Sequence, residues 1–275
     1  SVMKRIAVCI SGLIRYWEET YPLFEYWNEM FDDVEFTFFL STWEGNTWYD
    51  KEKFPNITLT DYDFSKYDFI EDYSLHNQSE VNISNSFKLP NGILRAYLWN
   101  KVNILRKNYE DTNDVKFDSV MLIRNDMFVN KDILKYSSLV SNLKQWNDYH
   151  FVFTMGGAQT YYEQKVNPVL FIGNDNFYLS SSKTMDLIMN LYDWITTDKL
   201  ISKSCHKSPA EFFIKNNIHN FTIGSAPIKL YREEPIIKSG NPTPQVMKKL
   251  IDEKGVKWIY DVGYEKLTTI YWNYE

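Results

Sequence analysis

Three continuous apolar runs, separated by segments with helical periodicity, constrain the fold most strongly. None of the runs alternates between apolar and polar residues, as a strand with one solvent-exposed face would. Each run is therefore expected to form a strand that is buried on both faces of a sheet. An amphipathic helix is predicted over residues 91–111, with basic residues on its outer faces. Strands that alternate with helices favour a three-layer, Rossmann-like α/β domain with a mainly parallel central sheet. The runs are Arg5–Ser11, Val34–Leu40 and Ser119–Arg124, and the apolar face of the helix is Leu94, Leu98, Val102 and Leu105.

The second half of the chain is predicted to be mixed α+β. Three short strands follow one another between residues 150 and 180, with no helical pattern between them. The stretch 181–195 has helical spacing, and a capping box over Ser208–Glu211 predicts the start of another helix. A last helix is expected to end at Gly255.

Composition excludes several classes of protein. The chain has 275 residues, 44% of them hydrophobic and 24% charged, which is typical of a globular protein with one large domain. The net charge is −6 and no basic stripe is present, so we expect no nucleic-acid partner. No apolar stretch approaches the roughly 18 residues of a membrane span. The apolar run near the N-terminus is too short for a signal peptide, and the two cysteines form no disulfide framework, so a cytoplasmic location is expected.

The common nucleotide and hydrolase motifs are absent from the sequence. The first strand is followed by a single glycine, so neither a dinucleotide fingerprint nor a phosphate loop of the Gly-x-x-x-x-Gly-Lys type is present. No Gly-x-Ser-x-Gly elbow occurs. The four histidines are scattered, with no pair at zinc-binding spacing.

What remains is a set of polar residues where strands end. Ligands of parallel α/β sheets bind beyond the carboxyl ends of the strands. After the first strand, Gly12 permits a ligand to approach the backbone, and Arg15 can pair with a phosphate. A third, short strand is expected at Thr58 and Leu59, and after the fourth, Ser119–Arg124, Asp126 offers a hard oxygen ligand for Mg²⁺ or Mn²⁺. The alternatives are a simple turn at Asp126 and a solvated helix start at Arg15.

Four segments in this order resemble a family of known enzymes. The segments are "IAVCISGLIR", "FTFFLSTWE", "FDSVMLIRNDMFV" and "FIGNDNFYLSSSKTMDLI". They resemble successive blocks of glycosyltransferases with the GT-A fold that act in capsule and surface-glycan synthesis and in large algal viruses. The resemblance implies a nucleoside diphosphate sugar as donor, a divalent metal, and a hydroxyl of a glycan or oligosaccharide as acceptor. It implies one domain over residues 1–275, with a donor half (1–130) and an acceptor half (131–275).

The resemblance also implies roles for residues of the donor half. It places one group beside the nucleotide or its phosphates and a second group beside the nucleoside. The pair Asn125-Asp126 replaces the family's Asp-x-Asp metal motif, with Asp126 as the metal ligand. Arg124 stands where the first acid of that motif would be and could itself neutralise the diphosphate. The first group is Ser11, Gly12 and Arg15, and the second is Thr42 and Trp43.

Other carboxylates offer alternatives. Asp61 and Asp63 form a literal Asp-x-Asp, but they begin a polar stretch that reads as a surface loop. Glycosyl transfer with inversion needs a base for the acceptor hydroxyl. Asp175, expected in a tight bend between two strands, is the first candidate for it, and Glu211 is the second, although its capping box already explains it.

Two other functions remain open at this stage. A glycosidase would use two carboxylates across the sugar, and Asp126 with Asp175 could form such a pair. A glycan-binding module is favoured by the aromatic content of 17%. Nucleotide binding separates the transferase from both. The sequence does not decide between inversion and retention.

Overall fold

The structure is a computed structural model. It describes residues 3–44, 62–81, 91–129, 131–143, 150–164, 167–201, 207–223, 228–229 and 244–262.

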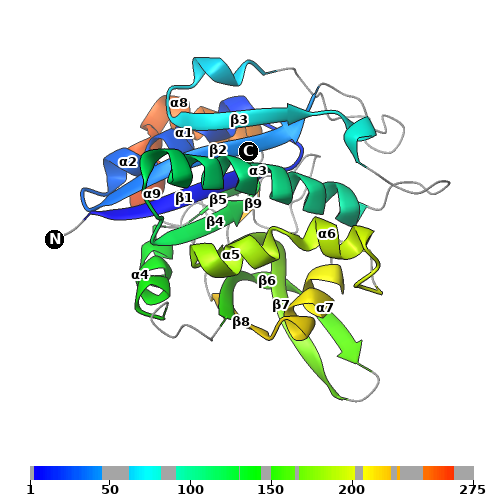
Figure 1. The fold of residues 1–275 in the computed structure, drawn as a ribbon. Coiled ribbons are helices and arrows are strands. Elements are labelled where there is room, and N and C mark those ends of the chain that lie inside the picture. Colours follow the sequence, from blue (N-terminus) through cyan, green and yellow to red (C-terminus); the bar gives the residue numbers. More distant parts are fainter. Residues whose placement is uncertain are drawn as a thin grey trace.

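Seven strands form one sheet in the order β3-β2-β1-β4-β7-β6-β8 (Figure 1). β7 runs antiparallel to both of its neighbours, β4 and β6, whereas the other four neighbouring pairs are parallel. A separate pair, β5 with β9, is antiparallel. The strands are β1 (Lys4–Ser11), β2 (Val34–Trp43), β3 (Ile70–His76), β4 (Ser119–Ile123), β5 (Met127–Phe128), β6 (His150–Gln164), β7 (Asn167–Ser180), β8 (Ile218–Ile223) and β9 (Ile228–Lys229).

Helices cover both faces of the sheet, which confirms the predicted three-layer α/β domain. In Figure 1, α3, α5 and α6 lie on the near side of the sheet, and α1 and α8 lie on the far side. The helices are α1 (Trp17–Glu25), α2 (Trp27–Met30), α3 (Asn91–Asn113), α4 (Ile133–Leu143), α5 (Ser182–Ile188), α6 (Leu191–Thr196), α7 (Lys207–Lys215), α8 (Pro244–Lys254) and α9 (Val256–Val262). Two short 3₁₀ turns, η1 (Phe64–Lys66) and η2 (Gln78–Glu80), flank β3.

The residues of β1 divide the core between the two helical layers. Ile6, Val8 and Ile10 pack with residues of α1, α2, α8 and α9. Ala7 and Cys9 face the opposite way, toward α3, α5, α6 and α7. Because successive side chains of a strand alternate between faces, an unbroken apolar run is what a strand between two helical layers requires.

Several predicted boundaries were wrong in an informative way. β2 continues through Thr42 and Trp43 because Trp43 still pairs with His76 of β3. The two strands predicted between residues 169 and 180 are one strand, β7, which forms a long hairpin with β6. The helix predicted over 181–195 is divided into α5 and α6. The predicted stop at Gly255 is confirmed, since its φ of 85° suits glycine. The strand expected near Thr58 lies outside the described residues.

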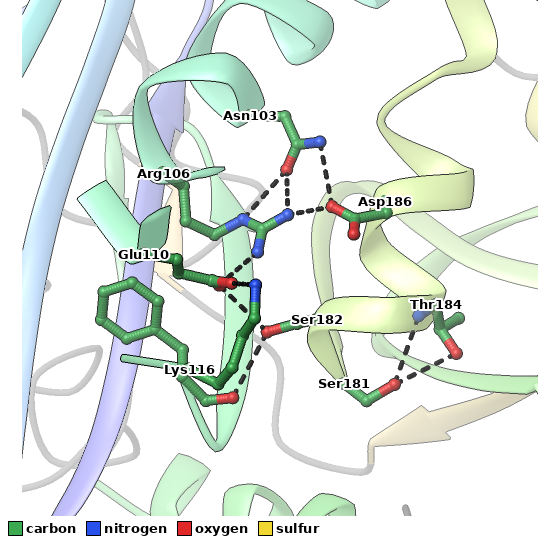
Figure 2. Close-up of polar contacts among 9 residues, drawn as sticks. Asn103, Arg106, Glu110, Lys116, Ser181, Ser182, Thr184 and Asp186 are labelled. Atoms are coloured by element: carbon green, nitrogen blue, oxygen red, sulfur yellow. Dashed lines mark hydrogen bonds and ion pairs between the residues drawn. The ribbon is translucent and has the colours of Figure 1, made fainter. Parts of the chain in front are cut away.

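The predicted outer face of α3 contains a buried cation, Arg106, with none of its side chain exposed. Figure 2 shows its guanidinium donating to Glu110 at 2.5 Å, to Asn103 and to Asp186 of α5. Lys116 donates to the other oxygen of Glu110 at 2.7 Å. These ion pairs hold α3 against α5, so this basic residue belongs to the packing of the domain rather than to its solvated surface.

None of the helices within the described ranges combines the length and apolar character that crossing a membrane requires.

Candidate functional site

The chain reverses its direction of travel across the sheet between β1 and β4. From β1 it adds β2 and then β3 on one side, and it then returns to place β4 on the other side of β1. The loops that follow β1 and β4 therefore leave the same edge in opposite directions. Open α/β sheets bind ligands at such a switch point. The residues after Ser11 and after Ile123 are thus the first place to look for a site.

Asn125 fastens these two loops together. Its side-chain oxygen accepts from the backbone N–H of Arg15 at 3.1 Å, and its amide donates to the Arg15 carbonyl at 2.6 Å. The same amide lies 3.2 Å from the hydroxyl of Thr20 in α1. Only 1% of Asn125 is exposed. The side-chain amide of Asn125 therefore bonds both main-chain groups of Arg15, and these two bonds fix the course of the loop after β1.

The loop after β2 joins the same arrangement. The hydroxyl of Thr42 donates to the carbonyl of Gly12 at 2.7 Å. Gly12 has a φ of 111°, where a side chain would be strained, and a Cβ placed there would meet no atom of the described residues within 4 Å, its chain neighbours apart. Its backbone is thus open on the side where a side chain would stand, as expected for a position where a ligand comes close.

Arg15 is held in this loop with its cation unsatisfied. The residue is 9% exposed, and within the described part of the chain its Nε and Nη1 are buried without a hydrogen-bond partner. A buried guanidinium without partners is costly, because its donors have lost water and gained nothing. Such a group needs a reason to remain, and an anion that supplies acceptors to both nitrogens is the simplest one.

Asp126 is buried and paired with the arginine two residues before it. The carboxylate accepts from Nε of Arg124 at 2.9 Å and also from its Nη2, and Asp126 is 1% exposed. Among the described residues, no three His, Cys, Asp or Glu side chains gather closely enough to hold a metal ion. A metal at Asp126 would have to displace Arg124. The described donors therefore fit an anion better than a protein-held cation.

Two residues expected near the nucleotide are packed instead of open. Trp43 is 5% exposed, and its ring stacks on Tyr97 of α3 with centroids 5.7 Å apart. Ser11 is 5% exposed and pairs in register with Ser41 of β2. Both lie at the carboxyl edge, but neither presents an exposed face, so Arg15 and the Gly12 backbone are the stronger contact points.

Asp175 does not lie in the expected bend between two strands, because β7 is continuous there. β7 pairs with β4 as far as Phe177 and Ile123. Asp175 lies two positions past Phe177, just as Asn125 lies two past Ile123, so the backbone of Asp175 runs beyond the carboxyl end of β4. Across residues 174–178, β7 advances four positions while β6 advances one. Such bulges redirect side chains; the side chain of Asp175 is outside the described part.

Glu211 has a structural role different from the predicted capping box. It lies within α7, is 1% exposed, and accepts from the backbone N–H of Ile201 through both carboxylate oxygens. Lys215 lies 3.9 Å away across one turn of the helix. The carboxylate therefore anchors the chain that follows α6, and a general-base role would have to break this contact.

The Asp-x-Asp at Asp61 and Asp63 is described only in part. Asp61 is outside the described residues. Asp63 caps η1, with its carboxylate accepting from the backbone N–H of Ser65 at 3.1 Å and from the Ser65 hydroxyl at 2.5 Å. The Ser65 hydroxyl lowers the pKa of Asp63, as expected for a carboxylate held by donors. These bonds support the surface-turn interpretation for Asp63.

Polar residues at the ends of β2 and β3 were not predicted from the sequence. Ser41 and Ser74 lie opposite each other in register, and their hydroxyl oxygens are 2.6 Å apart. The Ser74 hydroxyl is also 2.7 Å from Nε2 of His76. A usable signal was present, since Asn77 and Glu80 form a capping box. That box fixes the turn directly after His76.

Comparisons with known proteins give a fold likeness only. No protein-family model matches the chain. No curated protein matches it either. Among solved structures, 4-diphosphocytidyl-2C-methyl-D-erythritol synthase has a TM-score of 0.43 at 9% identity, covering 89% of this chain and 99% of that one. A glycosyltransferase involved in the glycosylation of the major capsid of PBCV-1 has a TM-score of 0.36 at 12% identity, covering 89% of this chain and 90% of that one.

A third solved structure is the glycosyltransferase GlyE of Streptococcus pneumoniae TIGR4, with a TM-score of 0.35 at 10% identity, covering 80% of this chain and 45% of that one. All three values are too low to assign the chain to a family. Any function must therefore be argued from the site itself.

Proposed function

We propose that this protein is a glycosyltransferase that moves a sugar from a nucleoside diphosphate sugar to a hydroxyl of a glycan. The observation that carries the proposal is the buried guanidinium of Arg15, with Nε and Nη1 unpartnered, at the switch point of the sheet. A diphosphate is the ligand whose charge and acceptor geometry suit a planar guanidinium. In this proposal residues 1–130 bind the donor and residues 131–275 the acceptor.

The chain's own residues supply binding and charge stabilisation. Arg15 pairs with phosphate oxygens, and the open backbone at Gly12 lets the diphosphate approach. As the bond from the sugar to the diphosphate breaks, negative charge grows on the leaving group, and a fixed cation stabilises that charge. Both carboxylate oxygens of Asp126 accept from one edge of the Arg124 guanidinium, through Nε and Nη2, and so keep a second cation in place. Asn125 fixes the loop that carries Arg15.

The acceptor proton must leave if the reaction inverts the sugar carbon. We assign Asp175 as the base that accepts it, because its backbone lies past the carboxyl end of β4 in an irregular part of β7. Glu211 is the weaker candidate, because its carboxylate already binds the Ile201 amide. A retaining reaction would need neither. Mn²⁺ or Mg²⁺ remains an optional partner of the donor diphosphate, to be tested directly.

The test is a thermal-shift panel of UDP, GDP, CDP and their sugar conjugates, each with EDTA and with Mn²⁺. A nucleotide at 100 times its dissociation constant should stabilise the fold by about 2.7 kcal/mol. Stabilisation in EDTA supports the arginine-based site. Stabilisation only with Mn²⁺ would return Asp126 to the role of metal ligand. If no nucleotide shifts the melting temperature, the proposal is wrong, and a glycan-binding module or a glycosidase becomes the better interpretation.

A further inference from the structure

A chain of hydrogen bonds at the carboxyl end of β3 lies outside the nucleotide site described above. Nε2 of His76 is 2.7 Å from the hydroxyl oxygen of Ser74, and Nδ1 of His76 is 3.0 Å from Oε2 of Glu80. The hydroxyl oxygen of Ser41 lies 2.6 Å from that of Ser74. Ser74 is half-buried, Ser41 is fully buried, and 12% of the His76 side chain is exposed.

Glu80 fixes the direction of every bond in this chain. Its carboxylate accepts from the backbone N–H of Asn77 at 2.9 Å and from the Tyr97 hydroxyl at 2.6 Å, in addition to His76. The Asn77 amide, followed by the Tyr97 hydroxyl and His76, lowers the pKa of Glu80 to about 2. An ionised carboxylate only accepts hydrogen bonds.

The tautomer of His76 follows from that charge. Nδ1 must carry the proton that Glu80 accepts, so in the neutral ring Nε2 is the acceptor. Ser74 then donates its proton to Nε2 and accepts from Ser41. The His76 ring also packs edge-to-face with the ring of Tyr97; the two ring centroids are 5.7 Å apart and the planes meet at 86°. The serine oxygen is thus polarised by a base whose orientation is fixed on two sides.

We propose that Ser74, His76 and Glu80 form a hydrolytic triad, a second reactive centre that takes carboxylic esters. Serine, imidazole and carboxylate stand in the order, and bond through the ring nitrogens, that nucleophilic serine catalysis requires. All three lie within seven residues, on the last strand positions of β3 and the turn that follows. The centre uses neither Arg15 nor Asp126, so it is independent of the proposed glycosyl transfer.

The reaction balances with the ester and water as the only reactants. The Ser74 oxygen attacks the acyl carbon while its proton passes to Nε2 of His76. The bond from the acyl carbon to the leaving alcohol breaks, and that alcohol takes the proton from Nε2. Water then attacks the acyl-serine, giving up a proton to the same nitrogen, and the free acid leaves as Ser74 recovers its proton. Glu80 is a positioning residue that stabilises the imidazolium.

The experiment treats the full chain with a fluorophosphonate probe and maps the adduct by peptide mass spectrometry, alongside hydrolysis of p-nitrophenyl acetate. The adduct is expected on Ser74 and is expected to disappear in Ser74→Ala. His76→Gln should slow labelling about 10²-fold or more, the usual contribution of a general base. The exposed Ser79 of η2 gives the matched control, and Ser79→Ala should be labelled at the unaltered rate.

Glu80→Gln separates reactivity from folding. The glutamine oxygen can still accept from Asn77 and preserve the turn, while the charge that sets the His76 tautomer is lost. We expect labelling at least about tenfold slower in a chain that still unfolds cooperatively, well above the temperature of the assay. Equal labelling of the unaltered chain and Glu80→Gln, an adduct on another residue, or no adduct at all would each overturn the proposal. Nucleotide-induced stabilisation of Ser74→Ala is measured in parallel; it should equal that of the unaltered chain, and its loss would contradict the independence of the two centres.

Discussion

Replacing Asn125 with alanine tests whether the site is built by one buried amide. The substitution removes the acceptor of the Arg15 N–H and the donor to the Arg15 carbonyl, at 3.1 and 2.6 Å. Both main-chain groups would remain in a buried loop, where an unmet donor or acceptor costs about 1–3 kcal/mol. We therefore expect Asn125→Ala to lower the free energy of unfolding by about 2–6 kcal/mol. At about 2–4 °C per kcal/mol, the melting temperature should fall by roughly 4–24 °C.

Asn28 provides a matched control in the same protein. Its amide also binds one residue on both sides, accepting from the Phe36 N–H at 2.8 Å and donating to the Phe36 carbonyl at 3.1 Å. Asn28 is exposed, so water can replace the lost amide, and we expect Asn28→Ala to cost about 1 kcal/mol. Urea unfolding with an unchanged m-value measures both. Equal losses of unfolding free energy in the two variants would refute the claim that burial of Asn125 makes its bonds to Arg15 important for stability.

Three further predictions concern groups away from the proposed nucleotide site. Arg106→Ala should cost about 3–5 kcal/mol because it removes the buried partner of the Glu110 carboxylate and leaves the exposed Lys116 as its remaining cation. Removal of the Lys116 side chain, 74% exposed, should cost at most about 1 kcal/mol; urea unfolding compares the two variants. Glu80 has a depressed pKa of about 2, so its contribution to stability is present above the ordinary pKa of a glutamate and is lost as pH falls toward 2. In Glu80→Gln, the unfolding midpoint should therefore change less with pH between the ordinary pKa of a glutamate and pH 2 than it does in the unaltered chain. Burial raises the pKa of Cys9 to about 12, so its peptide should escape iodoacetamide at pH 8 until the chain is unfolded.

The sequence predicted the layers of the fold because burial on both faces leaves a clear signal. In a chain with amphipathic helices, an unbroken apolar run such as that of β1 indicates a strand buried between two helical layers. The predicted end of the helix over residues 91–111 lies within two residues of the end of α3. β3 was missed because an edge strand is only partly buried; its sequence carries exposed acids at Glu71 and Asp72 and no continuous apolar run. The long β6–β7 hairpin was missed because glycines and asparagines within it read as turns.

The sequence predicted which strand ends lie at one edge of the sheet, but it did not predict the bonds that their residues make. Strand ends identified Arg15, Asn125 and Asp126, because parallel strands bring their carboxyl ends to one edge. The hydrogen-bond partners of these residues depend on distances between side chains in the folded chain, and the spacing of residues along the sequence does not give these distances. Asn125 was expected to touch a ligand and instead binds the main chain of Arg15. Asp126 was expected to bind a metal and is bound by Arg124, its near neighbour in sequence.

Calorimetric titration of UDP and uridine against Arg15→Met tests the central claim most directly, with the nucleoside and nucleotide pair changed if the panel selects another base. We predict that the unaltered protein binds the diphosphate far more tightly than the nucleoside. Arg15→Met should lose about 10–150-fold in diphosphate affinity, which corresponds to one charged hydrogen-bonding group at about 1.5–3 kcal/mol. Nucleoside affinity should barely change. Arg5→Met, at the opposite end of β1, should bind like the unaltered protein. Undiminished binding of the diphosphate by Arg15→Met would show that the Arg15 guanidinium does not bind it.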